Sequence, residues 1–449
     1  MKKLVVLGAG ESGLGAAMLA RQKGYAVFVS DGGQISPARK AEMERLEIDF
    51  EEGNHSEDKI LSAHLIIKSP GISPKIEMVT KAALTGIPII DELEFAFGYS
   101  SGKVIAITGT NGKTTTTLLT YHLMKEAGLD VGLAGNVGQS WAGQLLDTDH
   151  AWWVIECSSF QIDGFVNFKP SVAILCNITP DHLDRYEYKI ENYIDSKFGI
   201  FKNMTSEDQA ILFAEDELTQ KGLKTNEINA SILWISALEV QNAGAWTNGE
   251  ELVFAIAEKS VRVPVDTLSL KGKHNLLNSL CAGSAALIAG VSEVDLMLAF
   301  PTFKNAPHRM ELIREVDGVK FINDSKGTNV EATAYALASY ENPLIWIAGG
   351  VDKGNDYTVL SPLTEKVKSL ICLGKDNEKL KKAFAAQIKD IRETQDIAEA
   401  VIWGQEIGES GDVVLLSPAC ASFDLFKNYE DRGRQFRTAV ENLKPKAIA

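Results

Sequence analysis

The chain has 449 residues, of which 45% are hydrophobic and 23% charged, and its formal net charge is −15 at pH 7. This length exceeds one ordinary hydrophobic core, so we expect three domains. The composition is typical of a globular protein. The negative charge, with no basic stripe to offset it, disfavours a nucleic-acid partner.

The cysteines and the apolar stretches of the sequence indicate the cellular compartment of the protein. No stretch approaches the 18 consecutive apolar residues of a membrane-spanning helix, and the apolar N-terminal segment is too short for a signal peptide. We therefore expect a cytoplasmic location and no membrane partner. Five widely spaced cysteines in apolar settings predict reduced core residues: Cys157, Cys176, Cys281, Cys372 and Cys420.

The N-terminal segment predicts a strand, a glycine-rich turn and a helix. Residues 4–7 form the strand, Gly8-x-Gly10-x-x-Gly13 the turn, and residues 14–23 the helix; a second strand, 25–30, leads to Asp31. Taken alone, this spacing favours a nicotinamide or flavin enzyme. The same turn can hold another diphosphate, such as a nucleotide sugar, and a purely structural turn is the third possibility.

Turn-forming residues divide the rest of the chain. Further strands at 65–68, followed by Ser69, and at 88–90 complete a first domain over residues 1–97. A Gly- and Ser-rich linker leads into a second domain, 98–300. Prolines at 301 and 307 bracket a second linker, and the third domain covers 301–449.

The most informative stretch opens the second domain. Residues 104–107 predict a buried strand, GTNGKT (109–114) a turn, and the following residues a helix that stops before Gly128. This is the pattern of a phosphate-binding loop, in a form shorter than usual. Lys113 can reach the outer phosphates, and the Thr114 hydroxyl can bind Mg²⁺.

Polar residues follow two more predicted strands of this domain. Strand 152–155 leads to Glu156, and strand 172–177 leads to a segment containing His182. Because ligands gather at the carboxyl ends of parallel strands, we expect both side chains to face the phosphates. A carboxylate and an imidazole there would suit divalent metals. For the segment with His182, an N-cap or a salt-bridged loop is the alternative.

The remainder of the second domain carries fewer signals. A helix over 190–201 contains Lys197, which ordinarily would be a solvated lysine. Alternating strands follow, with an Asn248-Gly249 hairpin turn. Another helix begins near His274 and Asn275 and ends at Gly290. Its first asparagines could either cap the helix or contact a ligand.

The third domain repeats the arrangement of strands followed by polar segments. Strands at 320–323, 344–348 and 413–416 lead to segments that begin at Asp324, Gly349 and Ser417. We expect a third open α/β sheet with its own crevice. The fold class is therefore α/β in three domains: an N-terminal Rossmann-like domain, a central P-loop ATPase-like domain with a mostly parallel sheet, and a C-terminal Rossmann-like domain.

Together these segments resemble the ATP-dependent Mur ligases, which build the peptidoglycan stem peptide. The resemblance runs from Lys3 to about Leu443. Its most specific motifs are GTNGKT (109–114), ECSSFQ (156–161), DHLDR (181–185), HNLLN (274–278), PHRME (307–311), NDSKGTN (323–329), GGVDKG (349–354) and SPACASFDLFKNYEDRG (417–433). Within the family, the chain most resembles the branch that adds D-glutamate to UDP-N-acetylmuramoyl-L-alanine.

The resemblance implies a role for each matched residue. The catalytic group would be Lys113, Glu156, His182 and a carbamylated Lys197, and two Mg²⁺ ions would bind Thr114, Glu156, His182 and Lys197. ATP would contact Gly109, Thr110, Asn111, Gly112, Lys113, Thr114, Thr115, Asn275, His308, Arg309 and Asp324. The UDP-sugar would contact Ser12, Asp31, Ser69 and Asn136. D-Glutamate would contact Lys326, Thr328, Lys353, Ser422 and Tyr429.

The implied reaction has two steps, formation of an acyl phosphate from the alanine carboxylate and its capture by the D-glutamate amine. We expect a monomer whose third domain closes onto the second. Three alternatives stay open: another amino-acid-adding Mur ligase, a nicotinamide oxidoreductase that uses the first glycine turn, and a nucleotide-dependent switch without ligase chemistry.

Overall fold

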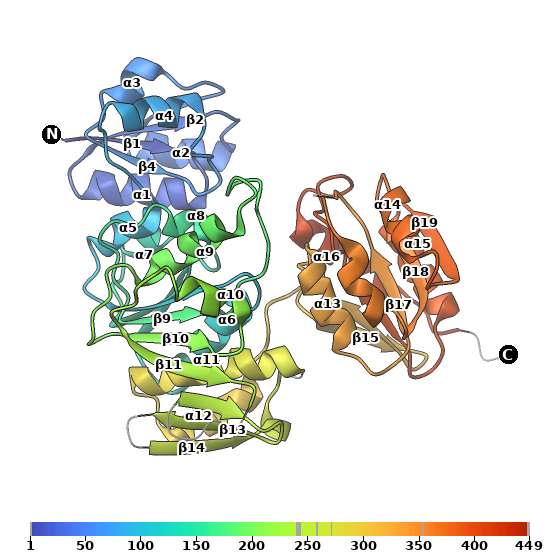
Figure 1. Cartoon of the computed structure of the whole chain (residues 1–449). Helices are drawn as coiled ribbons and strands as arrows, with labels where there is room; N and C mark the ends of the chain where they lie inside the picture. The colour runs from blue at the N-terminus through green and yellow to red at the C-terminus, as the bar shows by residue number, and fades with distance from the viewer. Residues whose placement is uncertain (1, 239–243, 257–258, 271, 353, 447–449) are drawn as a thin grey trace. The chain divides into compact units, whose positions relative to one another are not determined.

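The computed structural model describes residues 2–238, 244–256, 259–270, 272–352 and 354–446, and these form an α/β fold with three sheets (Figure 1). The fold has two compact units. The first contains the described residues of Met1–Ser269 and Asn275–Phe303, and the second those of Leu270–His274 and Lys304–Ala449. The first unit holds two of the sheets and the second holds the third.

The N-terminal sheet is parallel, with strand order β3-β2-β1-β4-β5. Its strands are β1 (Lys3–Leu7), β2 (Ala26–Asp31), β3 (Asp49–Glu52), β4 (Leu65–Lys68) and β5 (Ile89–Ile90). Its helices are α1 (Glu11–Gln22), α2 (Pro37–Arg45), α3 (Glu57–Leu61), α4 (Glu77–Leu84) and α5 (Glu92–Phe97). Apolar residues of α1, α2 and α5 cover one face and those of α3 and α4 the other.

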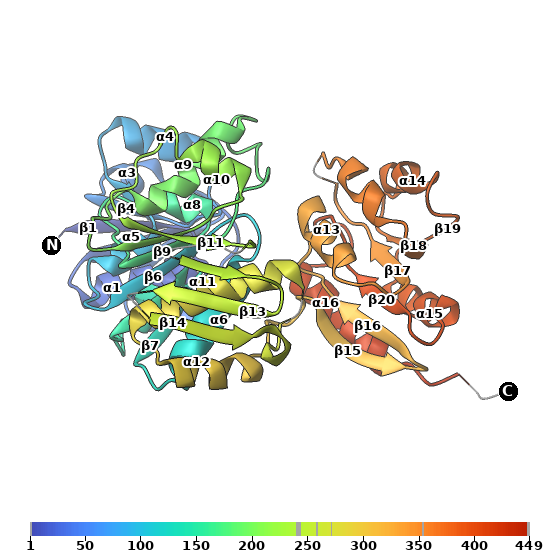
Figure 2. The same cartoon turned by 60° about the horizontal axis from the view of Figure 1, so that its bottom comes forward.

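The central sheet has the order β14-β13-β12-β11-β10-β9-β6-β8-β7. Its parallel strands are β6 (Lys103–Thr108), β7 (Val131–Gly135), β8 (Trp152–Glu156), β9 (Val172–Leu175), β10 (Gln209–Phe213), β11 (Ser231–Ser236) and β12 (Gly244–Thr247). Two antiparallel strands extend one edge, β13 (Glu251–Ile256) and β14 (Lys259–Pro264), and Figure 2 shows them beside α12.

The helices of the central domain follow these strands closely. They are α6 (Lys113–Glu126), α7 (Trp141–Gln144), α8 (Ser159–Ile162), α9 (Ile190–Phe198), α10 (Glu217–Gly222), α11 (Lys273–Ala289) and α12 (Glu293–Ala299). Glycines end two of them as the sequence predicts, because Gly128 and Gly290 have φ angles of 77° and 107°.

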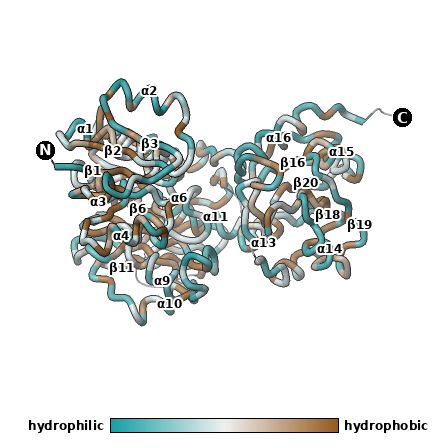
Figure 3. The backbone as a smooth tube through the Cα atoms, turned by 90° about the horizontal axis from the view of Figure 1, so that it is seen from above, coloured by the Kyte–Doolittle hydropathy of each residue, from teal (hydrophilic) through white to brown (hydrophobic). Residues whose placement is uncertain are grey.

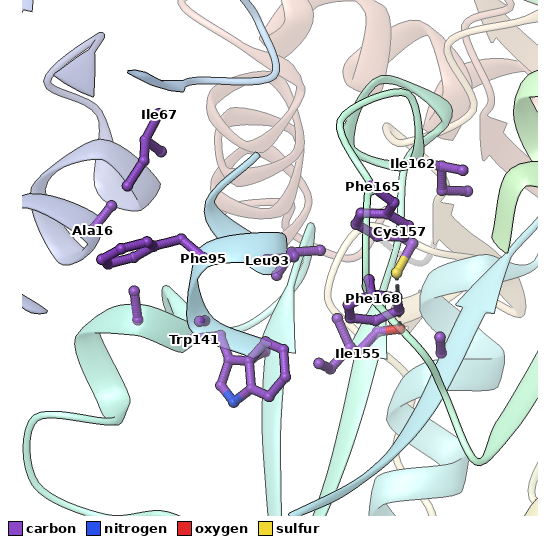
Figure 4. Close-up of a cluster of buried hydrophobic side chains, with 14 of the residues drawn as sticks. Ala16, Ile67, Leu93, Phe95, Trp141, Ile155, Cys157, Ile162, Phe165 and Phe168 are labelled. Carbon is purple, nitrogen blue, oxygen red and sulfur yellow. Dashed lines mark hydrogen bonds between the residues drawn. The ribbon is translucent and has the colours of Figure 1, made fainter. Parts of the chain in front are cut away.

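The N-terminal and central domains share one hydrophobic core. Figure 4 shows Phe95 of α5 beside Ala16 of α1, and Leu93 of the same helix on the side of Trp141 of α7. Helix α5 also bonds to the central domain through buried carboxylates. Glu94 accepts backbone N–H groups of the segment 166–168 at 2.8 to 3.0 Å.

The sheet of the second unit has the order β15-β16-β20-β17-β18-β19. Its strands are β15 (Glu311–Val316), β16 (Val319–Asn323), β17 (Leu344–Ala348), β18 (Val367–Leu373), β19 (Asp390–Thr394) and β20 (Val413–Leu416). Helices α13 (Val330–Ala338) and α14 (Glu378–Phe384) cover one face, and α15 (Ile397–Ile407) and α16 (Tyr429–Glu441) the other. Figure 3 colours both units by hydropathy, and apolar segments follow the buried strands.

The structure confirms the predicted α/β class and the strands and helices that the sequence indicated. The sequence did not single out the strands β3, β7, β15, β18 and β19. Of these, β15 begins at Glu311, the last residue of the PHRME motif, and pairs antiparallel with β16 at the sheet edge. All five cysteines are buried and unpaired. Among the described residues, no helix has both the length and the apolar character needed to cross a membrane.

Candidate active site

The turn between β6 and α6 has little room for side chains at its glycines. A Cβ at Gly109 would lie 2.9 Å from the Cβ of Cys176, and one at Gly112 would lie 2.4 Å from the Asn278 Oδ1. Both residues also have positive φ angles, 150° and 81°. Glycine is therefore required at both positions of the motif.

Residues after β9 fix the first part of this turn. The Thr110 amide donates to the Asn177 carbonyl at 2.9 Å, and the Asn111 amide donates to the Asn177 side chain at 2.9 Å. We therefore expect the anion contacts to come from the start of α6, not from these two amides. Thr114 and Thr115, which the sequence also assigned to ATP, are buried in that first helical turn.

Lys113 lies over the turn itself. Its ammonium donates to the carbonyls of Gly109 and Thr110 at 2.8 and 2.7 Å. A phosphate at the turn would offer the ammonium a charged acceptor in place of neutral carbonyls, and charge-assisted hydrogen bonds are about twice as strong as neutral ones.

Glu156 lies at the end of β8, beside the phosphate turn. It is the register neighbour of Ile107 on β6, and its side chain is 1% exposed. One carboxylate oxygen accepts from the Asn136 amide group at 2.8 Å, and the other has no hydrogen-bond partner among the described residues. A buried unpaired carboxylate oxygen is costly, and a divalent cation would satisfy it.

Asn136 thus has a neighbour that the sequence did not suggest. The prediction placed it on the UDP-sugar, whereas here it orients Glu156 through both its side chain and its backbone amide, which donates to the Glu156 carbonyl at 2.9 Å. The two roles are compatible only if substrate reaches the remaining polar atoms of Asn136.

His182 lies in the loop after β9, the strand on the other side of β6. Its backbone has a φ of 52°, a strained value for a residue other than glycine. The imidazole packs against the Phe160 ring with a centroid distance of 5.0 Å, and its Nε2 lies 3.7 Å from the Asp181 carboxylate. The ends of three adjacent strands therefore supply Glu156, Lys113 and His182.

Lys197 is not the solvated lysine that its helix position ordinarily implies. Its side chain is 1% exposed, and its Nζ lies 3.5 Å from the Thr108 hydroxyl and 4.8 Å from the Tyr193 ring centroid. Burial, and then the charge of Lys113, hold the pKa of Lys197 well below its ordinary value. A neutral amine is the form that carbamylation requires.

The alternative that the asparagines of α11 only cap that helix is wrong for Asn278. Its Oδ1 accepts from the Thr116 hydroxyl of α6 at 3.2 Å, and its amide group donates to the Asn275 Oδ1 at 3.1 Å. These residues therefore connect α11 to the phosphate-turn helix.

The first glycine turn is closed by its own acidic residue. One oxygen of Asp31 accepts from the Ala9 amide at 2.7 Å, and the other from the Gly33 amide at 2.8 Å. A Cβ at Gly13 would lie 1.9 Å from the Gly8 carbonyl oxygen. The Ser69 hydroxyl reaches the same carbonyl at 3.4 Å, and Ser12 lies in the first turn of α1.

In the second unit, Asp324 follows β16 and is buried. The Ser417 hydroxyl donates to it at 2.9 Å and the Met310 amide at 3.3 Å. Burial raises the pKa of Asp324 to about 7, with partial compensation from Ser417 and Arg309. His308 is also buried, and its ring lies 2.9 Å from the Asn323 amide nitrogen.

Lys326 and Tyr429 lie together in this unit. The Lys326 ammonium donates to the Tyr429 hydroxyl at 2.8 Å and lies 4.3 Å from the ring centroid. The Thr328 amide donates to the Lys326 carbonyl, and Ser422 is buried. Lys353 lies outside the described residues, so its predicted contact with D-glutamate remains a prediction.

Sequence reasoning gave no role to Arg432, although it lies within the final motif. It is 1% exposed and donates to the carbonyls of Ser325, Cys420 and Gly349 at 2.8, 3.3 and 3.4 Å. One guanidinium thus joins the loops after β16, β17 and β20. Its helix position gave no signal, since arginine is usual on the exposed face of such a helix.

The described residues contain no ready-made group of three or more His, Cys, Asp or Glu side chains that could hold a metal. A metal at Glu156 would therefore need hydroxyl, phosphate or carbamate ligands as well. The unpaired oxygen of Glu156 fits such a metal, and the buried amine of Lys197 fits conversion to a carbamate.

Comparison with known proteins gives a consistent result along the chain. Three family models match: "Mur ligase MurD-like, N-terminal domain" over residues 2–91, "Mur ligase middle domain" over 107–286, and "Mur ligase, glutamate ligase domain" over 308–420. UDP-N-acetylmuramoylalanine--D-glutamate ligase of Christiangramia forsetii is 47% identical over 98% of this chain and 100% of its own length. The Bacteroides fragilis protein of the same name is 46% identical over 99% and 100%.

Solved structures with the same fold include UDP-N-acetylmuramate-alanine ligase MurC from Thermotoga maritima, with a TM-score of 0.63, 18% identity, and coverage of 99% of this chain and 100% of that one. A pseudomurein peptide ligase type C from Methanothermus fervidus has a TM-score of 0.63, 19% identity and the same coverage. Because relatives above 45% identity match over their full length and three family models match in order, the chain belongs to the Mur ligase family.

Proposed function

We propose that this protein is an ATP-dependent amide ligase that adds D-glutamate to UDP-N-acetylmuramoyl-L-alanine in cytoplasmic peptidoglycan precursor synthesis. Full-length relatives that carry this activity in their names support the proposal. The structural observation that supports it is the buried carboxylate oxygen of Glu156, which has no hydrogen-bond partner among the described residues. Glu156 ends β8, which pairs with β6, the strand that leads into the phosphate turn.

Each domain binds one substrate. Residues 1–97 bind the UDP-sugar, residues 98–300 bind ATP, and residues 301–449 bind D-glutamate. The protein acts as a monomer. The UDP-sugar contacts are Ser12, Asp31, Ser69 and Asn136, and the D-glutamate contacts are Lys326, Thr328, Lys353, Ser422 and Tyr429.

ATP binds with its phosphates at the turn 109–114. The Lys113 ammonium moves from the carbonyls of Gly109 and Thr110 to the outer phosphates, where it offsets their charge. Asn275 and His308 contact the adenine, Arg309 the phosphates and Asp324 the ribose.

Thr114, Glu156, His182 and carbamylated Lys197 would hold two Mg²⁺ ions. When bound, these ions neutralise charge that develops on the transferring phosphoryl group. Asn136 holds the Glu156 carboxylate in place, and the Phe160 ring orients His182. The low exposure of Glu156 and Lys197 keeps water from competing at these positions.

The chemistry takes two steps. An oxygen of the alanine carboxylate attacks the γ-phosphorus in line, the bond from that phosphorus to the bridging oxygen breaks, and ADP leaves. Lys113 and the amides at the start of α6 stabilise the charge on the phosphoryl oxygens. The D-glutamate amine then attacks the acyl carbon, a C–N bond forms, the C–O bond to phosphate breaks, and the amine loses a proton.

Isotope transfer tests this route. The alanine carboxylate of the substrate is labelled with ¹⁸O, and the released phosphate is analysed by mass spectrometry after one round of reaction. An acyl phosphate predicts one ¹⁸O atom in each phosphate. Phosphate without label would show that water, and not the carboxylate, attacked ATP.

Carbamylation of Lys197 has its own test. Protein in ¹³C-bicarbonate should show a carbamate resonance that Lys197→Ala lacks and that Lys202→Ala, at an exposed lysine, retains. Activity lost in Lys197→Ala should return partly with added formate or acetate. Full activity in Lys197→Ala, or a spectrum without the resonance, would refute this role.

A further inference from the structure

A cavity lies on the other side of β4 from the first glycine turn, and no step of the proposed reaction uses it. Its volume is ≈ 230 Å³, and apolar side chains of α4, β5 and α8 form its walls. Strand order β2-β1-β4-β5 places the turn after β1 on one side of β4 and this cavity on the other. The charged residues that line the cavity are Lys68, Asp91, Asp163 and Arg185.

The two cations of the cavity hold one loop between them. The Lys68 ammonium donates to the carbonyls of Ser69 and Ile72 at 3.3 and 2.9 Å, and an Nη of Arg185 lies 3.4 Å from the Ile72 carbonyl. The Arg185 guanidinium stacks on Phe160, with its Cζ 3.7 Å from the ring centroid. This stacking fixes the plane of the guanidinium, so its edge presents N–H donors in one direction.

Arg185, which lines the cavity, has an unsatisfied donor. Its Nε is buried and has no hydrogen-bond partner among the described residues. A buried donor without a partner costs free energy, which a suitable acceptor would recover. The planar fork of a guanidinium matches a carboxylate best, because two parallel N–H···O bonds can form.

Among the described residues, the two cations of the cavity form no ion pair with its two carboxyl groups. In the part of the chain that the structure describes, neither Lys68 nor Arg185 has an ion pair within 4.0 Å. Asp163 accepts hydrogen bonds from the Ser196 and Tyr186 hydroxyls at 2.5 and 3.1 Å. Burial raises the pKa of Asp91 well above its ordinary range. The hydrogen bonds of Lys68 and Arg185 thus go to backbone carbonyls of the loop and not to the carboxyl groups of the cavity.

We propose that this cavity binds a small monocarboxylate with an apolar ring or branched chain. The carboxylate pairs with Lys68 and Arg185, and the apolar body lies against the walls formed by α4 and β5. The volume lies below the 300–1,000 Å³ common for drug-sized ligands, which limits the ligand to about one ring. A carboxylate would offer both cations a charged acceptor in place of the neutral Ile72 carbonyl.

Binding there should act on the first glycine turn. A carboxylate in the cavity competes with the Ile72 carbonyl for Lys68 and Arg185, and thereby releases the loop 69–73. The same loop packs on the glycine turn, where the Ser69 hydroxyl lies 3.4 Å from the Gly8 carbonyl. We expect occupancy to weaken binding at the turn. This consequence rests on the proposed function, whereas the binding itself does not.

Direct binding is measured by titration calorimetry on the full chain with 3-phenylpropionate, and 3-phenylpropanamide serves as the uncharged control. The expected Kd of the carboxylate is about 1 mM or tighter, and the amide should bind at least tenfold more weakly. No saturable binding up to about 10 mM, or equal affinity for the amide, would overturn the proposal.

Matched variants locate the site. Ala83→Trp places an indole at the exposed rim of the cavity and should abolish binding, whereas Leu84→Trp changes the neighbouring residue, which is 83% exposed and does not line the cavity. Arg185→Gln should weaken binding at least tenfold. The proposal fails if Ala83→Trp and Leu84→Trp bind 3-phenylpropionate equally well. Thermal melting of each variant confirms that it is folded.

Kinetics test the coupling separately. Saturating 3-phenylpropionate should raise the KM for UDP-N-acetylmuramoyl-L-alanine severalfold in the parent and in Leu84→Trp, with no change in Ala83→Trp. An unchanged KM in the parent at saturation would overturn the coupling. Failure of the proposed ligase function would instead appear as no turnover in any variant, while calorimetry would still report binding.

Discussion

The turn after β1 and the turn after β6 both lead from a parallel strand into a helix, but different groups close them. In the first, both oxygens of Asp31 accept backbone amides of the turn region. In the second, Asn177 takes the Thr110 and Asn111 amides, and Lys113 brings a positive charge over the loop. Glycine spacing thus specifies the path of the chain, and the side chains that close the turn determine which anion it suits.

The largest expected effect comes from removing the charge of the second turn. Lys113→Met should lower kcat/KM at least 10³-fold, about 4 kcal/mol of transition-state stabilisation, because the phosphoryl charge loses its nearest cation. Lys125→Met, at an exposed lysine of the same helix, should stay within twofold of the parent. ADP release measures both. A kcat/KM of Lys113→Met above a tenth of the parent value would contradict the role of this positive charge in the second turn.

A smaller effect concerns Glu92, a buried carboxyl group that supports the helix following the first turn. Helix α1 packs on α7, whose N-cap Ser140 donates to the buried Glu92 carboxylate at 2.8 Å. Burial raises the pKa of Glu92 from 4.5 to about 7. Because the folded state then binds the proton more tightly than the unfolded state, this stabilisation is present below about pH 4.5 and is lost as pH rises to 7.

The free energy of unfolding should therefore fall by up to about 3 kcal/mol more in the parent than in Glu92→Gln between pH 4.5 and 8. Urea denaturation at several pH values measures the difference. Parallel pH curves for the two proteins would contradict the assignment.

The next effect separates two glycines of the first turn. A Cβ at Gly13 would collide with the Gly8 carbonyl oxygen at 1.9 Å, whereas no heavy atom lies within 4 Å of a Cβ at Gly10. Gly13→Ala should destabilise the protein by about 2 kcal/mol and Gly10→Ala by less than about 0.5 kcal/mol, as measured in urea. Equal stabilities would show that the turn can shift to admit a side chain.

The smallest expected effect concerns Asp31, whose carboxylate closes the first turn. Asp31→Asn keeps one acceptor oxygen but loses the other, so the KM for the UDP-sugar should rise about tenfold, or about 1.4 kcal/mol. The KM for ATP should not change. A matching rise in the KM for ATP would show that the two turns do not act separately.

Much of the fold follows from local patterns in the sequence. The apolar runs at β1, β6 and β20 are completely buried strands with clear ends, and glycines with positive φ mark the ends of α6 and α11. The strand β15 escaped prediction because its burial alternates weakly at a sheet edge. Edge pairing depends on a distant partner, β16, and not on the local pattern alone.

The sequence indicated which strand ends carry the site residues, but it did not indicate which side chains contact one another there. Motif spacing identified Lys113 and Glu156, since their positions follow from β6 and β8. Nothing local indicated that Asn136 would hold Glu156, or that Arg432 would join three loops, because both contacts depend on tertiary packing. The burial of Lys197 likewise depends on the sheet beneath α9.

Release of phosphate, followed with each substrate omitted in turn and with D-glutamate, L-glutamate, L-alanine and diaminopimelate compared, tests the central claim most directly. We predict release only when ATP, UDP-N-acetylmuramoyl-L-alanine and D-glutamate are all present, with the amide product formed in equal amount. Release without an amino acid, or faster release with any of the other three, would contradict the account.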